Sequence, residues 1–131
     1  MNESCERWIL VVDDEPDMCW LLARIFRRAG WQVKTAGSGA EALARVEEQK
    51  FAAILLDWQL TDMKGTELTE KIHVCDPSAA LIMISGSDPK ATFLRQAYPQ
   101  GLIDCFVSKP FEHEHVVQSV ESAVLRKRGD T

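Results

Sequence analysis

The stretch WILVVDDEP, residues 8–16, is an apolar run that ends abruptly in three acidic residues and a proline. Four further strand-like runs lie at residues 32–36, 52–56, 80–84 and 105–107. The runs at residues 8–12, 52–56 and 80–84 contain almost no polar residue, which is typical of strands that are buried on both faces. The sequence therefore predicts five short strands, three of them inside a parallel sheet.

Helical patterns separate these runs, and capping residues, prolines and glycines mark their limits. The first helix carries an apolar stripe along one face, and the last helix is expected at residues 112–126. The other limits are Pro16 and Gly30 around the first helix, Ser38 with Glu41 at the start of the second, Lys64-Gly65 and Pro77 around the third, and Asp88-Pro89 at the start of the fourth. We therefore expect an α/β domain, with a five-stranded parallel sheet and helices on both faces.

The composition is that of one soluble domain. The chain has 131 residues and 46% hydrophobic residues, so residues 1–131 are expected to form a single domain with one core. The net charge of −5 argues against direct binding of nucleic acid by this domain, and no apolar run is long enough to cross a membrane. The N-terminus lacks the pattern of a signal peptide, and dispersed cysteines fit reduced thiols in a cytoplasmic protein. The cysteines are Cys5, Cys19, Cys75 and Cys105.

Polar side chains follow four of the five strands at their carboxyl ends. The first strand ends in Asp13-Asp14-Glu15, the third in Asp57, the fourth in Ser85-Gly86 and the fifth in Ser108-Lys109-Pro110. If the strand order is 2-1-3-4-5, these four strands are neighbours, and adjacent strands lie about 4.8 Å apart. We therefore expect the polar groups to converge on one pocket at the edge of the sheet where α/β proteins bind ligands.

The convergent residues have the chemistry that phosphoryl transfer to an aspartate requires. Carboxylates that lie close together repel one another unless a cation is present, and oxygen ligands without His or Cys favour a hard ion such as Mg²⁺. An aspartate can act as a nucleophile toward a phosphoryl group. A metal ion and a lysine would neutralise the charge of the transferring group, and a serine hydroxyl would bind another of its oxygens. A lone aspartate after a strand is more often a turn or cap residue, so this hypothesis depends on all of these residues meeting.

Four segments of the chain resemble the sequence blocks of response regulator receiver domains. They are VVDDEP (residues 11–16), LLDWQL (residues 55–60), MISG (residues 83–86) and VSKPF (residues 107–111). The resemblance covers about residues 8–125. It implies a flavodoxin-like (βα)5 fold with strand order 2-1-3-4-5, and a role as a response regulator in two-component signal transduction.

The resemblance also implies roles for the acidic residues. Asp57 would be the phosphoacceptor, and its donor would be a sensor histidine kinase, a phosphotransfer protein or a small molecule such as acetyl phosphate. Asp14 and Asp57 would hold Mg²⁺, with Asp13 acting through bound water and the backbone carbonyl of Gln59 as a further ligand. The domain would then be a signalling switch that assists its own phosphorylation and dephosphorylation, and not an enzyme with a separate substrate.

The resemblance also implies a conformational switch formed by residues of the last two strands. Lys109 would pair with the phosphoryl group, aimed by a cis bond to Pro110. Ser85 would move toward the phosphoryl oxygens, and Phe106 would swing inward behind it. These movements would change the surface of the fourth helix, fifth strand and fifth helix, which would contact an output domain or partner protein, including one that controls transcription. The domain would be a monomer, or a dimer that forms on phosphorylation.

Two features depart from the family pattern. Thr61 and Lys64 stand where a proline and an aspartate are usual, which puts the shape of the loop after Asp57 in doubt. The segment at residues 98–104 is about one residue longer than usual before the fifth strand. Because that segment belongs to the expected output face, the sequence does not specify the partner.

A dinucleotide-binding domain is the main alternative. Residues 37–42 match G-x-G-x-x-A between a strand and a helix, and Asp57 stands 20 residues after Gly37. However, this fingerprint belongs to the first strand–helix turn, whereas here it follows the second strand. Gly37 and Gly39 would otherwise serve a turn and a cap. A phosphatase with an aspartate nucleophile is less well matched, because position 59 is Gln59 and not a second aspartate.

Overall fold

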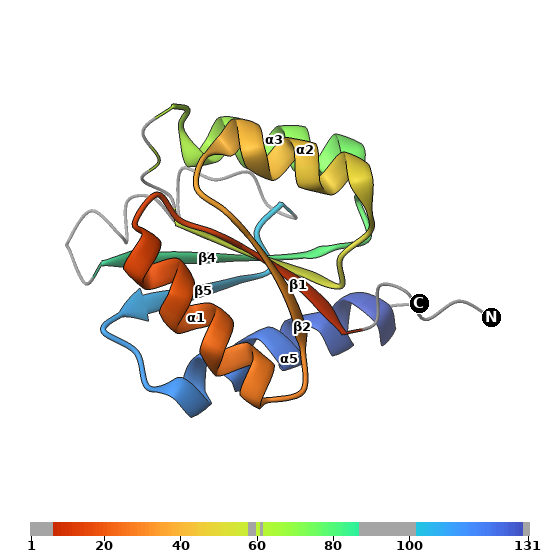
Figure 1. The fold of residues 1–131 in the computed structure, drawn as a ribbon. Coiled ribbons are helices and arrows are strands. Elements are labelled where there is room, and N and C mark those ends of the chain that lie inside the picture. Colours follow the sequence, from red (N-terminus) through yellow and green to blue (C-terminus); the bar gives the residue numbers. More distant parts are fainter. Residues whose placement is uncertain (1–6, 58–59, 61, 87–101, 130–131) are drawn as a thin grey trace.

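The computed structural model describes residues 7–57, 60, 62–86 and 102–129, apart from the side chains of Thr66 and Ser85. Within these residues, five parallel strands form one sheet in the order β2-β1-β3-β4-β5 (Figure 1). The strands are β1 (Trp8–Val12), β2 (Gln32–Ala36), β3 (Ala53–Asp57), β4 (Ala80–Gly86) and β5 (Cys105–Lys109). The predicted fold class and strand order are confirmed.

Three strands differ in extent from the predicted runs. β3 lies one residue later than predicted, and β4 and β5 each continue two residues further. The added residues pair with one another, Ser85 opposite Ser108 and Gly86 opposite Lys109. Backbone hydrogen bonds need no apolar side chain, so hydrophobicity alone could not show this extension. Its effect is to carry Lys109 to the edge of the sheet where β3 ends in Asp57.

The helices cover both faces of the sheet, as predicted. α1 (Pro16–Arg28) and α5 (His113–Gly129) lie on one face, and α2 (Gly39–Glu48) and α3 (Gly65–Cys75) lie on the other (Figure 1). The predicted helix that begins at Asp88-Pro89 lies outside the described residues. α5 ends three residues later than predicted, and the basic side chains of its last turn complement the negative end of the helix dipole.

The helix limits follow from the capping residues. Ser38 Oγ accepts a hydrogen bond from the backbone N–H of Glu41 at 3.1 Å, which starts α2. The Glu41 carboxylate accepts the N–H of Gly37 at 2.8 Å, one residue before the position that a capping box would use. Gly30, with φ of 97°, ends α1 by turning the chain so that the N–H of Trp31 reaches the carbonyl of Phe26 at 2.9 Å.

Alternate strand residues build two apolar layers. Ile9 and Val11 pack with the side chains of α1 and α5, whereas Leu10 and Val12 pack with those of α2 and α3. All four side chains are at most 1% exposed, and burial of a side chain of this size contributes about 1.5–3 kcal/mol. The two layers fix the central strands, and therefore fix the strand ends that carry the polar residues. Within the described residues, none of the helices combines the length and apolar character needed to span a bilayer.

Candidate functional site

Three of the predicted site residues meet at the carboxyl edge of the sheet. The ammonium of Lys109 donates a hydrogen bond to Asp57 Oδ2 at 3.0 Å and lies 3.9 Å from Asp13 Oδ2. The Asp57 side chain is 12% exposed and that of Lys109 is 25% exposed. The ammonium of Lys109 therefore lies near both carboxylates, at a part of the sheet edge that is only partly exposed to solvent.

The strand register explains this convergence. The N–H of Asp13 bonds to the carbonyl of Ala36, so the pairing of β1 with β2 continues one residue past the end of β1. Asp57 lies opposite Ile84, near the end of β4, and Lys109 lies opposite Gly86. Residues far apart in the sequence thus reach one edge because parallel strands end side by side. The bond between Lys109 and Pro110 is cis, as the family resemblance implied.

Asp13 is more deeply buried than Asp57 and Lys109. It is 2% exposed, and its Oδ1 accepts the N–H of Glu15 at 2.9 Å. The pKa of Asp13 is raised from 3.8 to about 6, and burial is the largest cause. The N–H of Glu15 and the ammonium of Lys109 lower this pKa, whereas the carboxylates of Asp57 and Asp14 raise it. Burial is the largest of these causes, so the ionised form of Asp13 is disfavoured although the ammonium of Lys109 lies nearby.

Asp14 follows Asp13 in the chain and lies near the start of α1. It is half-buried and lines a pocket of about 380 Å³ with Asp13, Trp20, Arg27 and Glu41. Its carboxylate is close enough to raise the pKa of Asp13. The structure therefore places Asp14 next to the predicted site, at its α1 side.

Other predicted site residues are only partly described. Gln59 lies outside the described residues, and Ser85 is placed by its backbone alone, at the end of β4. Phe106 is half-buried in β5, opposite Met83, and packs against the apolar layer under α2 and α3. Among the described residues, no three His, Cys, Asp or Glu side chains are arranged to hold a metal ion. The predicted donor set of carboxylates and one backbone carbonyl nevertheless fits Mg²⁺ in type.

The glycines of residues 37–42 do not form an open phosphate-binding loop. The Asp62 carboxylate accepts the N–H groups of Gly39 and Ala40 at 2.9 and 3.0 Å, and Glu41 accepts that of Gly37. The amides that would cradle a dinucleotide phosphate are therefore already bonded to carboxylates of this chain. A Cβ at Gly39 would also meet the side chain of Met63 at 2.5 Å. Gly37 lies in the turn after β2, and Gly39 is the first residue of α2, behind the N-cap Ser38. The structure therefore disfavours the dinucleotide alternative.

Sequence reasoning missed two residues that support the site. Asp62 links the loop after β3 to the start of α2, and the bonds to the α2 amides lower its pKa. Nothing in the sequence indicates this contact, because it joins residues 22 and 23 positions apart. Cys19 donates its thiol to the carbonyl of Asp13 at 3.2 Å, and burial raises its pKa. The sequence analysis gives Cys19 no role beyond that of a reduced thiol, although its helical spacing from Leu22 and Phe26 places it on the buried stripe of α1.

Comparison with known proteins identifies the family. The model of the response regulator receiver domain matches residues 9–121. The probable transcriptional regulatory protein TcrX of Mycobacterium tuberculosis is 32% identical over 123 residues, which are 94% of this chain and 51% of TcrX. The transcriptional regulatory protein ZraR of Salmonella typhimurium is 29% identical over 92% of this chain and 27% of ZraR. A CheY-like receiver domain protein from Methanospirillum hungatei has a TM-score of 0.85 at 26% identity, covering 95% of this chain and 98% of that one.

The chain belongs to the response regulator receiver domain family, and its role in two-component signal transduction follows from that membership. It is homologous to transcriptional regulators, and it spans about half the length of TcrX and about a quarter of the length of ZraR. The identification that the four sequence segments predicted is therefore confirmed.

Proposed function

We propose that Asp57 is the phosphoacceptor of this receiver domain and that its donor is a sensor histidine kinase, a phosphotransfer protein or a small phosphodonor. The observation that carries the proposal is the contact of Lys109 with Asp57, 3.0 Å long, beside the buried carboxylate of Asp13. A structural aspartate at the end of a strand would need neither a lysine from another strand nor a second acidic group. A phosphoryl acceptor needs both kinds of neighbour.

The chain's own groups have distinct tasks in this transfer. A carboxylate oxygen of Asp57 forms the new bond to phosphorus while the bond from phosphorus to the donor atom breaks. Lys109 exchanges its contact with the Asp57 carboxylate for one with a phosphoryl oxygen and so compensates the charge that the acceptor gains. The hydroxyl of Ser85 binds another phosphoryl oxygen, since its strand ends beside β3.

Asp13, Asp14, Asp57 and the backbone carbonyl of Gln59 would hold Mg²⁺. Their oxygen-only donor set suits that ion, and the acidic charge around Asp13 favours a divalent cation. When bound, the ion supplies positive charge that stabilises the phosphoryl oxygens during transfer.

The output of the switch follows from the position of Phe106. This side chain lies on β5, the strand that carries Lys109, and is half-buried against the α2–α3 layer. We infer that a change at Lys109 and Ser85 is transmitted to Phe106, and from there to the surface of α4, β5 and α5, where α4 is the helix expected after Asp88-Pro89. We propose that this surface controls an output domain or partner protein, including one that regulates transcription, as the names of TcrX and ZraR suggest.

In this proposal the chain is a signalling domain and not an enzyme with a separate substrate. Residues 1–131 form one domain in this proposal, with its core at about residues 8–125. A net charge of −5 makes direct binding of nucleic acid by this domain unfavourable, and its partners and donors are those of a cytoplasmic protein.

Incubation with acetyl phosphate and Mg²⁺, followed by intact mass measurement, tests the acceptor. We expect one added phosphoryl group on the wild type and none on Asp57→Asn. Asp17→Asn is the matched control, because it removes an exposed carboxylate from the first turn of α1 and should leave uptake unchanged. Uptake by Asp57→Asn at the wild-type level would refute the assignment of the acceptor, and chelation of Mg²⁺ should abolish uptake by the wild type.

A further inference from the structure

The side chain of Asp62 connects the chain that leaves β3 after Asp57 to the start of α2. Its two carboxylate oxygens each accept one backbone N–H, Oδ1 from Gly39 at 2.9 Å and Oδ2 from Ala40 at 3.0 Å. These are the first two residues of α2, so the carboxylate also lies at the positive end of the helix dipole. Hydrogen bonds to an ionised carboxylate are stronger than those between neutral groups. Asp62 therefore forms a charge-assisted contact between two segments that are distant in the sequence.

Met63 adds an apolar contact at the same place. Its side chain is half-buried and packs against the apolar layer under α2 and α3, as does that of Leu60. Met63 also occupies the space beside the α-carbon of Gly39, since a Cβ at Gly39 would lie 2.5 Å from Met63 Cγ. The contact of Asp62 with α2 is thus flanked by apolar contacts on the same face of the sheet.

The start of α3 gives this segment less support. Lys64 is the N-cap residue of α3, and its side chain has no hydrogen-bond acceptor with which to cap the helix. The aspartate that is usual at this position would be a good N-cap residue. Thr61 likewise lacks the fixed φ angle of the proline that is usual there. Because both departures remove a local constraint, the contact of Asp62 with α2 supplies a constraint that these positions do not.

The start of α2 also adjoins the acidic residues that follow β1. The carbonyl of Ala36 accepts the N–H of Asp13 at 3.1 Å. Glu41, in the first turn of α2, lines one pocket with Asp13 and Asp14. The segment after β1 and the segment after β3 therefore both contact this part of the chain, which limits how far they can move relative to each other.

We propose that Asp62 is a positioning residue for phosphoryl transfer to Asp57. Asp57 is the last residue of β3, where it lies opposite Ile84. The sheet therefore holds the chain on the N-terminal side of Asp57, and the contact of Asp62 with α2 limits its movement on the C-terminal side.

This inference rests on the proposed function, in which the Asp57 carboxylate accepts the phosphoryl group and also holds Mg²⁺. A displacement of about 1 Å at a reacting group can slow a reaction on the order of 100-fold. Loss of the Asp62 contact therefore weakens Mg²⁺ binding and slows transfer, although Asp62 touches neither the ion nor the phosphoryl group.

Two measurements on Asp62→Ala and Asp62→Asn test the inference. Titration calorimetry gives the Mg²⁺ dissociation constant, and intact mass gives the rate of phosphoryl uptake from acetyl phosphate at several Mg²⁺ concentrations. We expect Asp62→Ala to raise the dissociation constant, and the Mg²⁺ concentration for half-maximal uptake, by about tenfold, the lower end of the range for residues that orient a metal ligand. Asp62→Asn keeps one acceptor oxygen and should give values between those of Asp62→Ala and wild type.

Ser38→Ala is the matched control for the stability of α2. It removes the side-chain cap at the start of the same helix but leaves the Asp62 carboxylate in place. Urea unfolding should show that Ser38→Ala and Asp62→Ala are destabilised to a comparable extent. Only Asp62→Ala should change the Mg²⁺ dissociation constant by more than about twofold.

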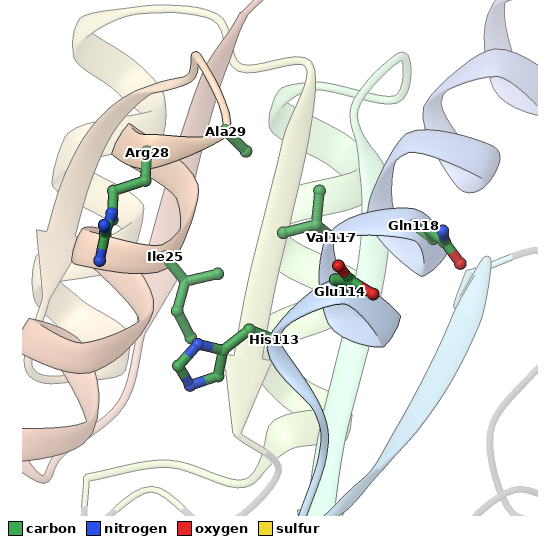
Figure 2. A pocket seen from close by; sticks show the side chains of 7 residues that line it. All are labelled: Ile25, Arg28, Ala29, His113, Glu114, Val117 and Gln118. Carbon is green, nitrogen blue, oxygen red and sulfur yellow. The ribbon is translucent and has the colours of Figure 1, made fainter.

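Glu114→Gln controls for the loss of an exposed carboxylate. Figure 2 shows Glu114 on α5, where it lines a pocket of about 590 Å³ between α1 and α5, on the other face of the sheet. This substitution changes the net charge by the same amount as Asp62→Asn. It should leave both Mg²⁺ binding and phosphoryl uptake at the wild-type values.

The failure of this inference is distinguishable from the failure of the proposed function. Mg²⁺ affinity and uptake at wild-type values in Asp62→Ala would overturn the inference alone. Equal losses in Ser38→Ala would also overturn it, because the stability of α2 would then account for both. A wild type that binds no Mg²⁺, takes up no phosphoryl group, or takes it up no better than Asp57→Asn would instead refute the proposed site, and this inference with it.

Discussion

Replacement of Asp13 by asparagine should stabilise the protein at neutral pH in the absence of Mg²⁺. Asp13 is 2% exposed and lies beside two other acidic residues, and Lys109 compensates the charge only in part. Asparagine has nearly the same shape, and its side-chain oxygen can still accept the N–H of Glu15 that Asp13 Oδ1 accepts now. The substitution therefore removes the buried charge while keeping the local hydrogen bond.

The size of the effect follows from the pKa of Asp13. This pKa rises from 3.8 to about 6 on folding, and one pKa unit corresponds to about 1.4 kcal/mol. The folded state thus binds the proton more tightly than the unfolded state. The contribution of Asp13 to stability is present below about pH 4 and is lost as the pH rises through about 6. At neutral pH the ionised side chain lowers the free energy of unfolding by about 3 kcal/mol.

Urea unfolding of wild type and Asp13→Asn in a metal chelator measures this difference. At about pH 7.5 the variant should be more stable by about 2–3 kcal/mol, and at about pH 4 the two proteins should be nearly equal, with the same dependence on urea at both pH values. Glu47→Gln, which removes an exposed carboxylate from α2, is the control and should show no such pH dependence. An Asp13→Asn protein that is no more stable than wild type at neutral pH, or whose gain is the same at both pH values, would refute the reasoning.

Three further predictions probe other parts of the structure, and the last has a control substitution. Asp62→Ala removes the acceptor of two N–H groups at the start of α2. Urea unfolding should show that the free energy of unfolding falls by about 1–2 kcal/mol, and an unchanged urea midpoint would contradict the capping role. Lys109→Ala should still take up a phosphoryl group, as intact mass would show, but should lose the phosphorylation-dependent change in hydrogen exchange of β5; a wild-type exchange response would count against the role of the lysine. Leu10→Ala removes a fully buried side chain and should lower the free energy of unfolding by about 2–5 kcal/mol. Leu125→Ala, at a side chain that is 67% exposed, should change stability by less than about 0.5 kcal/mol, and equal losses would show that the burial is misassigned.

The central strands were predictable because they are buried on both faces. The limits of β1 agree with the sequence prediction to the residue, since an apolar run inside a parallel sheet has polar residues only at its ends. The same reasoning placed Asp13 and Asp57 at the edge of the sheet. It could not show that β4 and β5 extend into Ser85-Gly86 and Ser108-Lys109, because backbone pairing continues where hydrophobicity stops.

The contacts within the site could not be predicted from the hydrophobic periodicity of the sequence alone. That Lys109 meets Asp57 depends on the strand order, which came from the family resemblance and not from the residues themselves. The bonds of Asp62 to α2 were not predictable, because they join a loop to a helix that is distant in sequence. The burial of Asp13, which decides its pKa, arises from packing of several elements around the end of β1. The local sequence pattern thus indicates which residues lie at the edge of the sheet. Packing between distant segments determines their contacts and their pKa values.

The bonds from Asp62 to Gly39 and Ala40 make the start of α2 a natural reporter of the loop that follows Asp57. A rearrangement of that loop large enough to displace the Asp62 carboxylate would release both amide protons at once. Their chemical shifts and exchange rates would then change together, although neither residue belongs to the acidic cluster. Nuclear magnetic resonance of these two backbone positions could therefore follow the state of the loop without any label near the acceptor.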